Sequence, residues 1–262
     1  MPFERIKAIL LQEWYITRKS LEVILDLFYF SLINIIVFGF VFTFLSKQED
    51  SVGAVYILLG MILWEVIRIT QYSISVGALW NIWSRNLSNM FIAPLTIFEY
   101  LAAAMLSGAI KTIPTVLIIS AVAYFIFNFN IFTIGIVNLG LFFVNLSLFA
   151  WSVGITILAI IFRYGQRLQA LAWGLIFLFQ PLTAVFFPVS ILPDTLKTIA
   201  YLLPPTYVFE AARAGLSNPS VNWQATTIAF AGNIVYLLIS LWFFNYMLKK
   251  SKDIGQFARN EG

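Results

Sequence analysis

Neither cysteine nor histidine occurs anywhere in the 262 residues of this chain. Without thiols or imidazoles the chain has no disulfide, no thiol or histidine catalysis and none of the usual zinc ligands, so we expect no metal site. Charged residues are also scarce, at 11% of the sequence. A typical soluble protein has about a quarter. Any catalysis would therefore rest on carboxylates alone.

Nucleotide-binding and catalytic motifs are missing as well. The nearest approach to an ATP-binding loop, residues 108–112, lacks the second glycine that lets the backbone wrap a phosphate. The HExxH, GxSxG and GxGxxG patterns do not occur, and no two carboxylates lie close together within one expected span. We therefore expect that the chain is not an enzyme, that it holds no cofactor itself and that it does not hydrolyse ATP.

Apolar residues, in contrast, are abundant. They make up 61% of the chain, and the mean hydropathy is +0.89. This composition predicts an all-α polytopic membrane protein. The net charge of +4 does not indicate nucleic-acid binding, because the basic residues flank the apolar stretches, where they would meet membrane lipid headgroups.

Six apolar stretches predict six transmembrane helices, so that residues 1–262 form a single transmembrane domain. An amphipathic helix over 3–21 is expected to precede them, flat in the membrane interface, although it could also extend the first span. The capping box from Thr96 to Glu99 would start the third span. The six predicted spans are 25–45, 53–78, 97–127, 131–161, 168–188 and 223–248.

Basic residues predict how the chain is oriented. Six spans put both termini on one side of the membrane, and eleven Lys and Arg residues fall on that side against three on the other. By the positive-inside rule the side with the termini is cytoplasmic. We therefore expect a bacterial cell (inner) membrane protein whose N- and C-termini are both cytoplasmic.

The segment 79–96 is too polar to span a membrane, yet it has helical periodicity. Drawn as a helix, it places Trp83, Leu87 and Met90 on one side and Arg85 on the other. Its position on the cytoplasmic side predicts a docking helix. The alternative is an interfacial helix that only anchors the loop between two spans.

Residues 188–216 begin at the end of an apolar run and then depart from the pattern of a span, because Pro188, Pro193, Pro204 and Pro205 interrupt it. Broken backbone at membrane depth is tolerated only where protein or a water-filled cavity satisfies its polar groups. We therefore expect a re-entrant helical hairpin on the external side. Glu210 and Arg213 share one helix face there, either as a structural pair or as part of a gate.

Three of the five charged residues inside the expected spans lie away from the ends of their spans. Glu65 and Arg68 lie three apart on one helical face, where they can form an ion pair. Lys111 lies in the third expected span. All three could line a pathway, and all three could instead be structural.

Two stretches resemble a known family. The pattern FFPVSILPDTLKTIAYLLPPTYVFEAAR, residues 186–213, resembles the signature of the type-2 ATP-binding-cassette (ABC) export permeases, and Ala93-Pro94-Leu95 resembles the end of that family's cytoplasmic segment. The resemblance implies that residues 83–90 are a coupling helix contacting an ABC ATPase and that 188–216 are an external gate. It further implies two copies of that ATPase subunit, which would hold the ATP and Mg2+, and a second copy of this chain.

The family's cargo ranges from lipid-linked polysaccharide and glycolipid to drug-like molecules, all exported from the cytoplasm. Two other classes of function stay open from the residues alone. One is an integral membrane transferase acting on lipids through Asp26, Glu65 or Glu210. The other is a channel or carrier that works without ATP. Neither alternative has a positive sequence feature, whereas the exporter has two.

Overall fold

The computed structural model describes residues 2–47, 51–86, 90 and 92–255, and within them all regular structure is helical. The elements, in chain order, are α1 (Pro2–Lys19), α2 (Leu21–Ile24), the π-helical η1 (Leu25–Tyr29), α3 (Phe30–Ser46), α4 (Ser51–Trp83), α6 (Ile97–Phe127), the 3-10 turn η2 (Ile131–Ile134), α7 (Ile136–Tyr164), the 3-10 turn η3 (Gln166–Leu168), α8 (Leu171–Gly174), the 3-10 turn η4 (Leu175–Leu178), α9 (Phe179–Leu182), the 3-10 turn η5 (Val189–Ile191), α10 (Asp194–Leu202), α11 (Pro204–Ser217) and α12 (Trp223–Asp253). The prediction of an all-α membrane protein is confirmed at this level.

Five helical stretches of the described chain are long and apolar enough to cross a membrane: Leu21–Ser46, Gly53–Trp83, α6, α7 and α12. Burial separates two of them from the rest. In α4 and α7, 78% of the most apolar window is buried inside the protein, against 33% in α6 and 22% in the first stretch and in α12. α4 and α7 therefore form the core of the bundle, while the other three present apolar faces outward.

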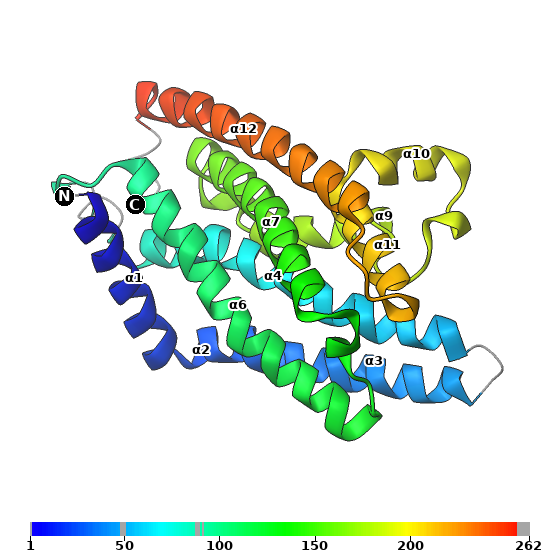
Figure 1. Cartoon of the computed structure of the whole chain (residues 1–262). Helices are drawn as coiled ribbons and strands as arrows, with labels where there is room; N and C mark the ends of the chain where they lie inside the picture. Colours follow the sequence, from blue (N-terminus) through cyan, green and yellow to red (C-terminus); the bar gives the residue numbers. More distant parts are fainter. Residues whose placement is uncertain (1, 48–50, 87–89, 91, 256–262) are drawn as a thin grey trace.

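The predicted fifth span, 168–188, is not one continuous α-helix. Residues 166–191, from η3 to η5, alternate between short α-helices, 3-10 turns and bends, and we refer to them as the broken segment (Figure 1). Pro181 has no N–H to donate within it. The Ala172 carbonyl accepts hydrogen bonds from Gln71 Nε2 at 3.0 Å and from Ser75 Oγ at 3.4 Å, both on α4. A sixth regular span is therefore not confirmed within the described residues.

Local sequence signals explain several element boundaries. The Thr96 hydroxyl accepts from the backbone N–H of Glu99 and the Glu99 carboxylate accepts from that of Thr96, so the predicted capping box starts α6. The fourth predicted span, 131–161, begins with a 3-10 turn, because Gly135 at φ 94° separates that turn from α7.

Buried amides hold the long helices together. Asn233 Nδ2 of α12 donates to the carbonyl of Asn145 on α7 at 2.9 Å and to its side-chain oxygen at 3.2 Å. Asn138 Nδ2 donates to the carbonyl of Pro219 at 2.8 Å. The Asn233 bonds are the interhelical use expected of polar side chains between membrane helices, and the Asn138 bond joins α7 to the connection between α11 and α12.

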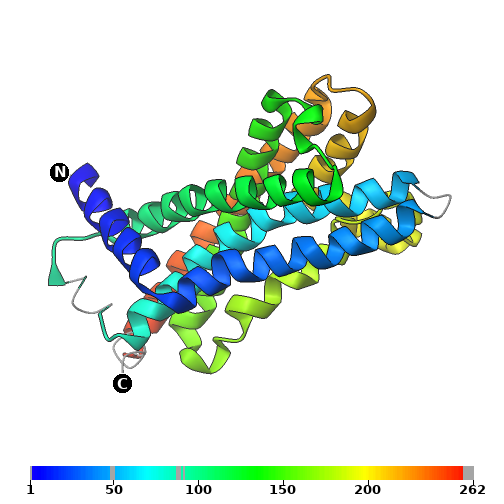
Figure 2. The same cartoon turned by 90° about the horizontal axis from the view of Figure 1, so that it is seen from below.

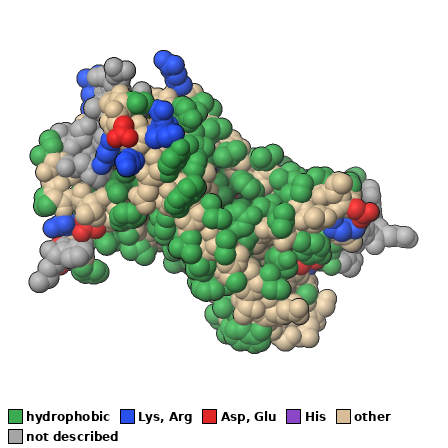
Figure 3. All heavy atoms as spheres, turned by 90° about the horizontal axis from the view of Figure 1, so that it is seen from above, with side chains coloured by type: hydrophobic (Ala, Val, Ile, Leu, Met, Phe, Trp, Pro, Cys, Tyr) green, Lys and Arg blue, Asp and Glu red, His purple; other side chains and the backbone are tan. Residues whose placement is uncertain are grey.

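The molecule has two ends with an apolar body between them. The start of α1 and the end of α12 lie at one end, which we call the terminal end, together with the end of α4 and the start of α6 (Figure 1). The end of α3, the start of α4 and the helices α10 and α11 lie at the opposite, distal end (Figures 1 and 2). In the space-filling view, Lys and Arg side chains gather mainly at the terminal end, and hydrophobic side chains cover most of the body (Figure 3).

Candidate functional site

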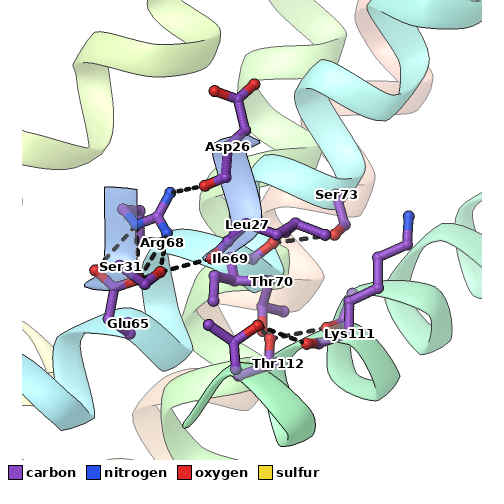
Figure 4. Close-up of polar contacts among 12 residues, drawn as sticks. Asp26, Leu27, Ser31, Glu65, Arg68, Ile69, Thr70, Ser73, Lys111 and Thr112 are labelled. Carbon is purple, nitrogen blue, oxygen red and sulfur yellow. Dashed lines mark hydrogen bonds and ion pairs between the residues drawn. The ribbon is translucent and has the colours of Figure 1, made fainter. Parts of the chain in front are cut away.

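A buried ion network connects η1, α3 and α4 (Figure 4). Arg68 Nη2 lies 2.6 Å from Glu65 Oε2, and Arg68 Nε donates to the same carboxylate at 2.9 Å. Ser31 Oγ donates to Glu65 Oε2 at 2.6 Å and accepts from Arg68 Nη2 at 2.7 Å. The remaining guanidinium nitrogen, Nη1, donates to the backbone carbonyl of Asp26 at 3.3 Å. The ion pair expected from the i, i+3 spacing is therefore present.

Burial makes this pairing necessary. Glu65 is fully buried, and the side chain of Arg68 is only 12% exposed. An unpaired charge at such a place would cost several kcal/mol, whereas a hydrogen-bonded pair with extra partners recovers much of that cost. Glu65 therefore serves the structure by neutralising Arg68, and it faces no open space of its own.

Arg68, in contrast, also reaches a cavity. The cavity has a volume of about 330 Å³ and lies between η1, α3, α4 and the broken segment. Its polar lining is Asp26, Asn34, Arg68, Gln71 and Tyr72, and its apolar lining is Phe30, Ala172, Trp173, Ile176 and Phe177. A largely apolar hollow of about 300 to 1,000 Å³ with a few convergent polar groups is the usual form of a small-molecule site.

Lys111 does not join this network. Its Nζ lies 2.7 Å from Glu13 Oε2, which ties α6 to α1 across 98 residues of sequence. Glu13 is only 7% exposed, and the Ser107 hydroxyl donates to it at 3.5 Å. Lys111 also lines an apolar groove of about 500 Å³ between α1, η1 and α6. Glu65 and Arg68 thus belong to one site and Lys111 to another.

The predicted coupling segment differs from a single helix. Leu79 and Ile82 are buried, so α4 continues to Trp83, five residues past the expected end of the second span at 78. The chain then turns at Ser84 and Arg85, and Arg85 has a φ of 51°. The prediction of a separate helix over 79–96 is therefore wrong for residues 79–83, which belong to α4 and carry buried apolar side chains.

The residues assigned to the coupling contact lie in different surroundings. Trp83 is 37% exposed and stacks on Trp173 of α8, with ring centroids 6.1 Å apart. Arg85 is exposed at the terminal end. Met90 helps to line a hollow of about 230 Å³ against α1. Leu87 lies outside the described residues.

The predicted hairpin 188–216 contains two helices that meet at Leu203, α10 and α11. Each of its prolines occupies a position that suits a missing N–H. Pro188 precedes η5 and Pro193 precedes α10, while Pro204 and Pro205 are the first two residues of α11. The prolines therefore set where these short helices begin.

Glu210 and Arg213 of α11 bind the broken segment as well as each other. Their ion pair measures 2.9 Å. Arg213 Nη1 donates to the carbonyl of Ala184 at 2.9 Å, and Glu210 Oε1 accepts from the backbone N–H of Val189 at 2.8 Å. Ala184 has a φ of 52°, a left-handed conformation that costs energy for a residue with a Cβ. Side chains of α11 thus form hydrogen bonds with backbone groups of the broken segment, where the regular helical hydrogen bonds are interrupted.

Sequence reasoning missed part of the cavity. Gln71 and Tyr72 were not identified, although they follow Arg68 by three and four residues and so share its helix face. Asp26 was considered only as a transferase carboxylate. Its partner in the structure is Tyr72, whose hydroxyl donates to Asp26 Oδ2 at 2.6 Å across 46 residues of sequence. No local pattern signals a contact at that separation.

Five apolar helices around a buried polar network define a multi-spanning helical membrane protein. Residues 4–217 match the ABC-2 type transporter family, which is most of the chain, and the chain therefore belongs to this family. Its members are membrane components of transporters and are not ATPases themselves; they typically work with an ABC ATPase. No curated protein matches the chain.

Proposed function

We propose that this chain is the permease subunit of an ATP-driven exporter. It moves a hydrophobic or amphipathic molecule out of the cytoplasm of a bacterial cell, through the cell membrane. Two copies of the chain act together with two copies of an ABC ATPase subunit, which bind ATP and Mg2+. In this arrangement the terminal end is cytoplasmic and faces the ATPases.

The observation that carries the proposal is the continuity between the terminal end and the cavity. α4 has 33 residues, while about 20 cross the hydrocarbon of a bilayer, so it is long enough for its Trp83 end to reach beyond the apolar region. The same helix carries Arg68, Gln71 and Tyr72 of the cavity lining. A push on residues 84–96 would therefore act on the cavity through α4 and, on the other side, on α6.

A second connection runs through stacked tryptophans. Trp83 at the end of α4 stacks on Trp173, and Trp173 belongs to the wall of the cavity. The broken segment, which carries Trp173, consists of short elements that can change their relative angles more easily than a long helix. Motion at the terminal end thus has a direct mechanical route to the broken segment.

The size of the bundle supports assembly as a dimer. One chain supplies five long helices within its described part, and two of them fill the core, which leaves few to enclose a path for a large amphiphile. α3 exposes large aromatic side chains, Phe40 at 64% and Phe44 at 62%. Such a face is satisfied by lipid or by a second copy of the chain. Mass measurement in mild detergent, with the co-expressed ATPase, tests the two-plus-two composition.

Charge reversal at the terminal end tests the ATPase contact. We expect Arg85→Glu to leave insertion and dimer formation intact but to weaken co-purification of the ATPase or to uncouple its hydrolysis from export, because a guanidinium on a docking face meets acidic or carbonyl groups. The matched control is Lys47→Glu, an exposed charge at the distal end, which should change neither.

Two outcomes would count against the proposal. If Arg85→Glu, Trp83→Ala and Leu87→Ala all bind the ATPase and export normally, the segment after α4 is not the coupling element. Transport by the purified chain in vesicles without any ATPase would instead establish a carrier or channel.

A further inference from the structure

The charged groups at the cavity beside α4 carry a net negative charge. Arg68 uses Nε and Nη2 on Glu65 and Nη1 on the backbone carbonyl of Asp26. Figure 4 shows the Asp26 carboxylate pointing away from the guanidinium that binds its backbone. Within the described residues this carboxylate forms no ion pair, and its hydrogen bond comes from the neutral Tyr72 hydroxyl. The network of two carboxylates and one guanidinium therefore has one uncompensated negative charge, and that charge lines the cavity.

Aromatic rings form much of the remaining lining. Phe30, Trp173 and Phe177 line the same cavity as Asp26, and Tyr72 adds a fourth ring. A cation close to an aromatic face gains about 0.5 to 2 kcal/mol, more when it has lost its water. A carboxylate among aromatic rings is thus suited to an ammonium-type or phosphonium-type cation with an apolar body.

Other ligand chemistries fit the cavity less well. An anion would be repelled by the Asp26 carboxylate, and four of the five N–H groups of Arg68 are already engaged with Glu65, Ser31 and the Asp26 carbonyl. A neutral polar molecule would leave the Asp26 charge uncompensated at a place where charge is costly. A cation alone removes that cost.

We propose that the cavity lined by Asp26, Phe30 and Trp173 binds the cationic group of an amphiphilic substrate. The cationic group lies near Asp26, and the apolar body contacts the rings of α3, α4 and the broken segment. This inference names a substrate class for the proposed exporter and rests on that function only for the claim that the bound molecule is then transported.

The test uses two probes of the same shape and opposite charge. Tetraphenylphosphonium carries a positive charge and tetraphenylborate a negative one, and binding of each to the purified full-length chain in detergent is measured by equilibrium dialysis. We expect the phosphonium to bind saturably and the borate to bind at least tenfold more weakly at this site. Equal binding of both probes to the unaltered chain would overturn the proposal.

Asp26→Asn then locates the cation. An Asn side-chain oxygen still accepts the Tyr72 hydrogen bond, so this variant removes the charge with little change in packing. We expect it to weaken phosphonium binding roughly tenfold, and Trp173→Leu to weaken it several-fold. The control, Asp253→Asn, makes the same chemical change at the exposed end of α12 and should bind as the unaltered chain does.

The outcomes separate this inference from the proposed function. If Asp26→Asn and Trp173→Leu both bind the phosphonium with unchanged affinity while the chain still assembles with an ATPase, the exporter stands and the cation site is wrong. If binding depends on Asp26 but no ATPase associates with the chain, the cation site stands and the exporter is wrong. The comparison of the two probes uses the unaltered chain, so it can still refute the proposal if a variant fails to fold.

Discussion

Removing Arg213 should destabilise the protein more than removing any exposed charge. Arg213 is 5% exposed. It donates hydrogen bonds to the carbonyls of Ala184 at 2.9 Å and Val185 at 3.4 Å, and it forms an ion pair with Glu210 at 2.9 Å. Loss of one partner of a buried ion pair costs about 3 to 5 kcal/mol. Since the Glu210 side chain is 36% exposed and can be hydrated, we expect Arg213→Met to cost about 3 kcal/mol, at the lower end of that range.

The partner substitution should cost less. In Glu210→Gln the amide oxygen can still accept from Val189 and from Arg213 Nη2, and the Ala184 carbonyl still accepts from Arg213, but the buried guanidinium loses its counter-charge, so we expect about 2 kcal/mol. The loss of stability in the double variant should be about 1 kcal/mol smaller than the sum of the two single losses, because both single variants remove the same ion pair. Unfolding by sodium dodecyl sulfate in mixed micelles, followed by circular dichroism, measures each difference.

The control is Lys197→Met. Lys197 pairs with Asp194 at the same i, i+3 spacing, but the Asp194 side chain is fully exposed, so the expected loss is at most about 0.5 kcal/mol. The reasoning is refuted if Arg213→Met costs no more than this control, or if the coupling energy of the double-mutant cycle is near zero. Normal stability with poor export would instead make the pair part of a gate.

Two further substitutions test other contacts of the fold. A Cβ at Gly60 would collide with the backbone carbonyl of Val185, so Gly60→Ala should lower the unfolding free energy by about 1 kcal/mol or more. The control Gly140→Ala, with open space around it, should be neutral or slightly stabilising. Equal effects of the two substitutions would show that α4 and the broken segment do not pack closely. Lys111→Met should cost about 3 kcal/mol because it leaves Glu13 buried without its cation, and adding Glu13→Gln should recover part of that loss; no recovery would rule out the ion pair as the cause.

The broken segment is where the structure departs most from a regular membrane helix. Its backbone groups are bound from two sides, by Gln71 and Ser75 of α4 near its start and by Glu210 and Arg213 of α11 near its end. Each of these side chains is held by a continuous helix. These bonds satisfy backbone groups that an irregular path leaves unpaired, which is the condition for such a path inside a bilayer.

Local chemistry was readable from the sequence. The apolar stretches, the Thr96 capping box and the ion pairs Glu65–Arg68 and Glu210–Arg213 all depend on residues at most a few positions apart, where helix geometry alone decides which side chains meet. The composition likewise determined that the chain is a helical membrane protein. These features need no knowledge of how the helices pack.

Packing decided the rest. The contacts of Glu13 with Lys111 and of Asp26 with Tyr72 join residues 98 and 46 positions apart. The end of α4 depends on the burial of Leu79 and Ile82, and hydropathy along the chain does not show which polar segments are covered by other helices. The cavity exists only because η1, α4 and the broken segment converge, and convergence of distant segments is a property of the tertiary structure that no local pattern encodes.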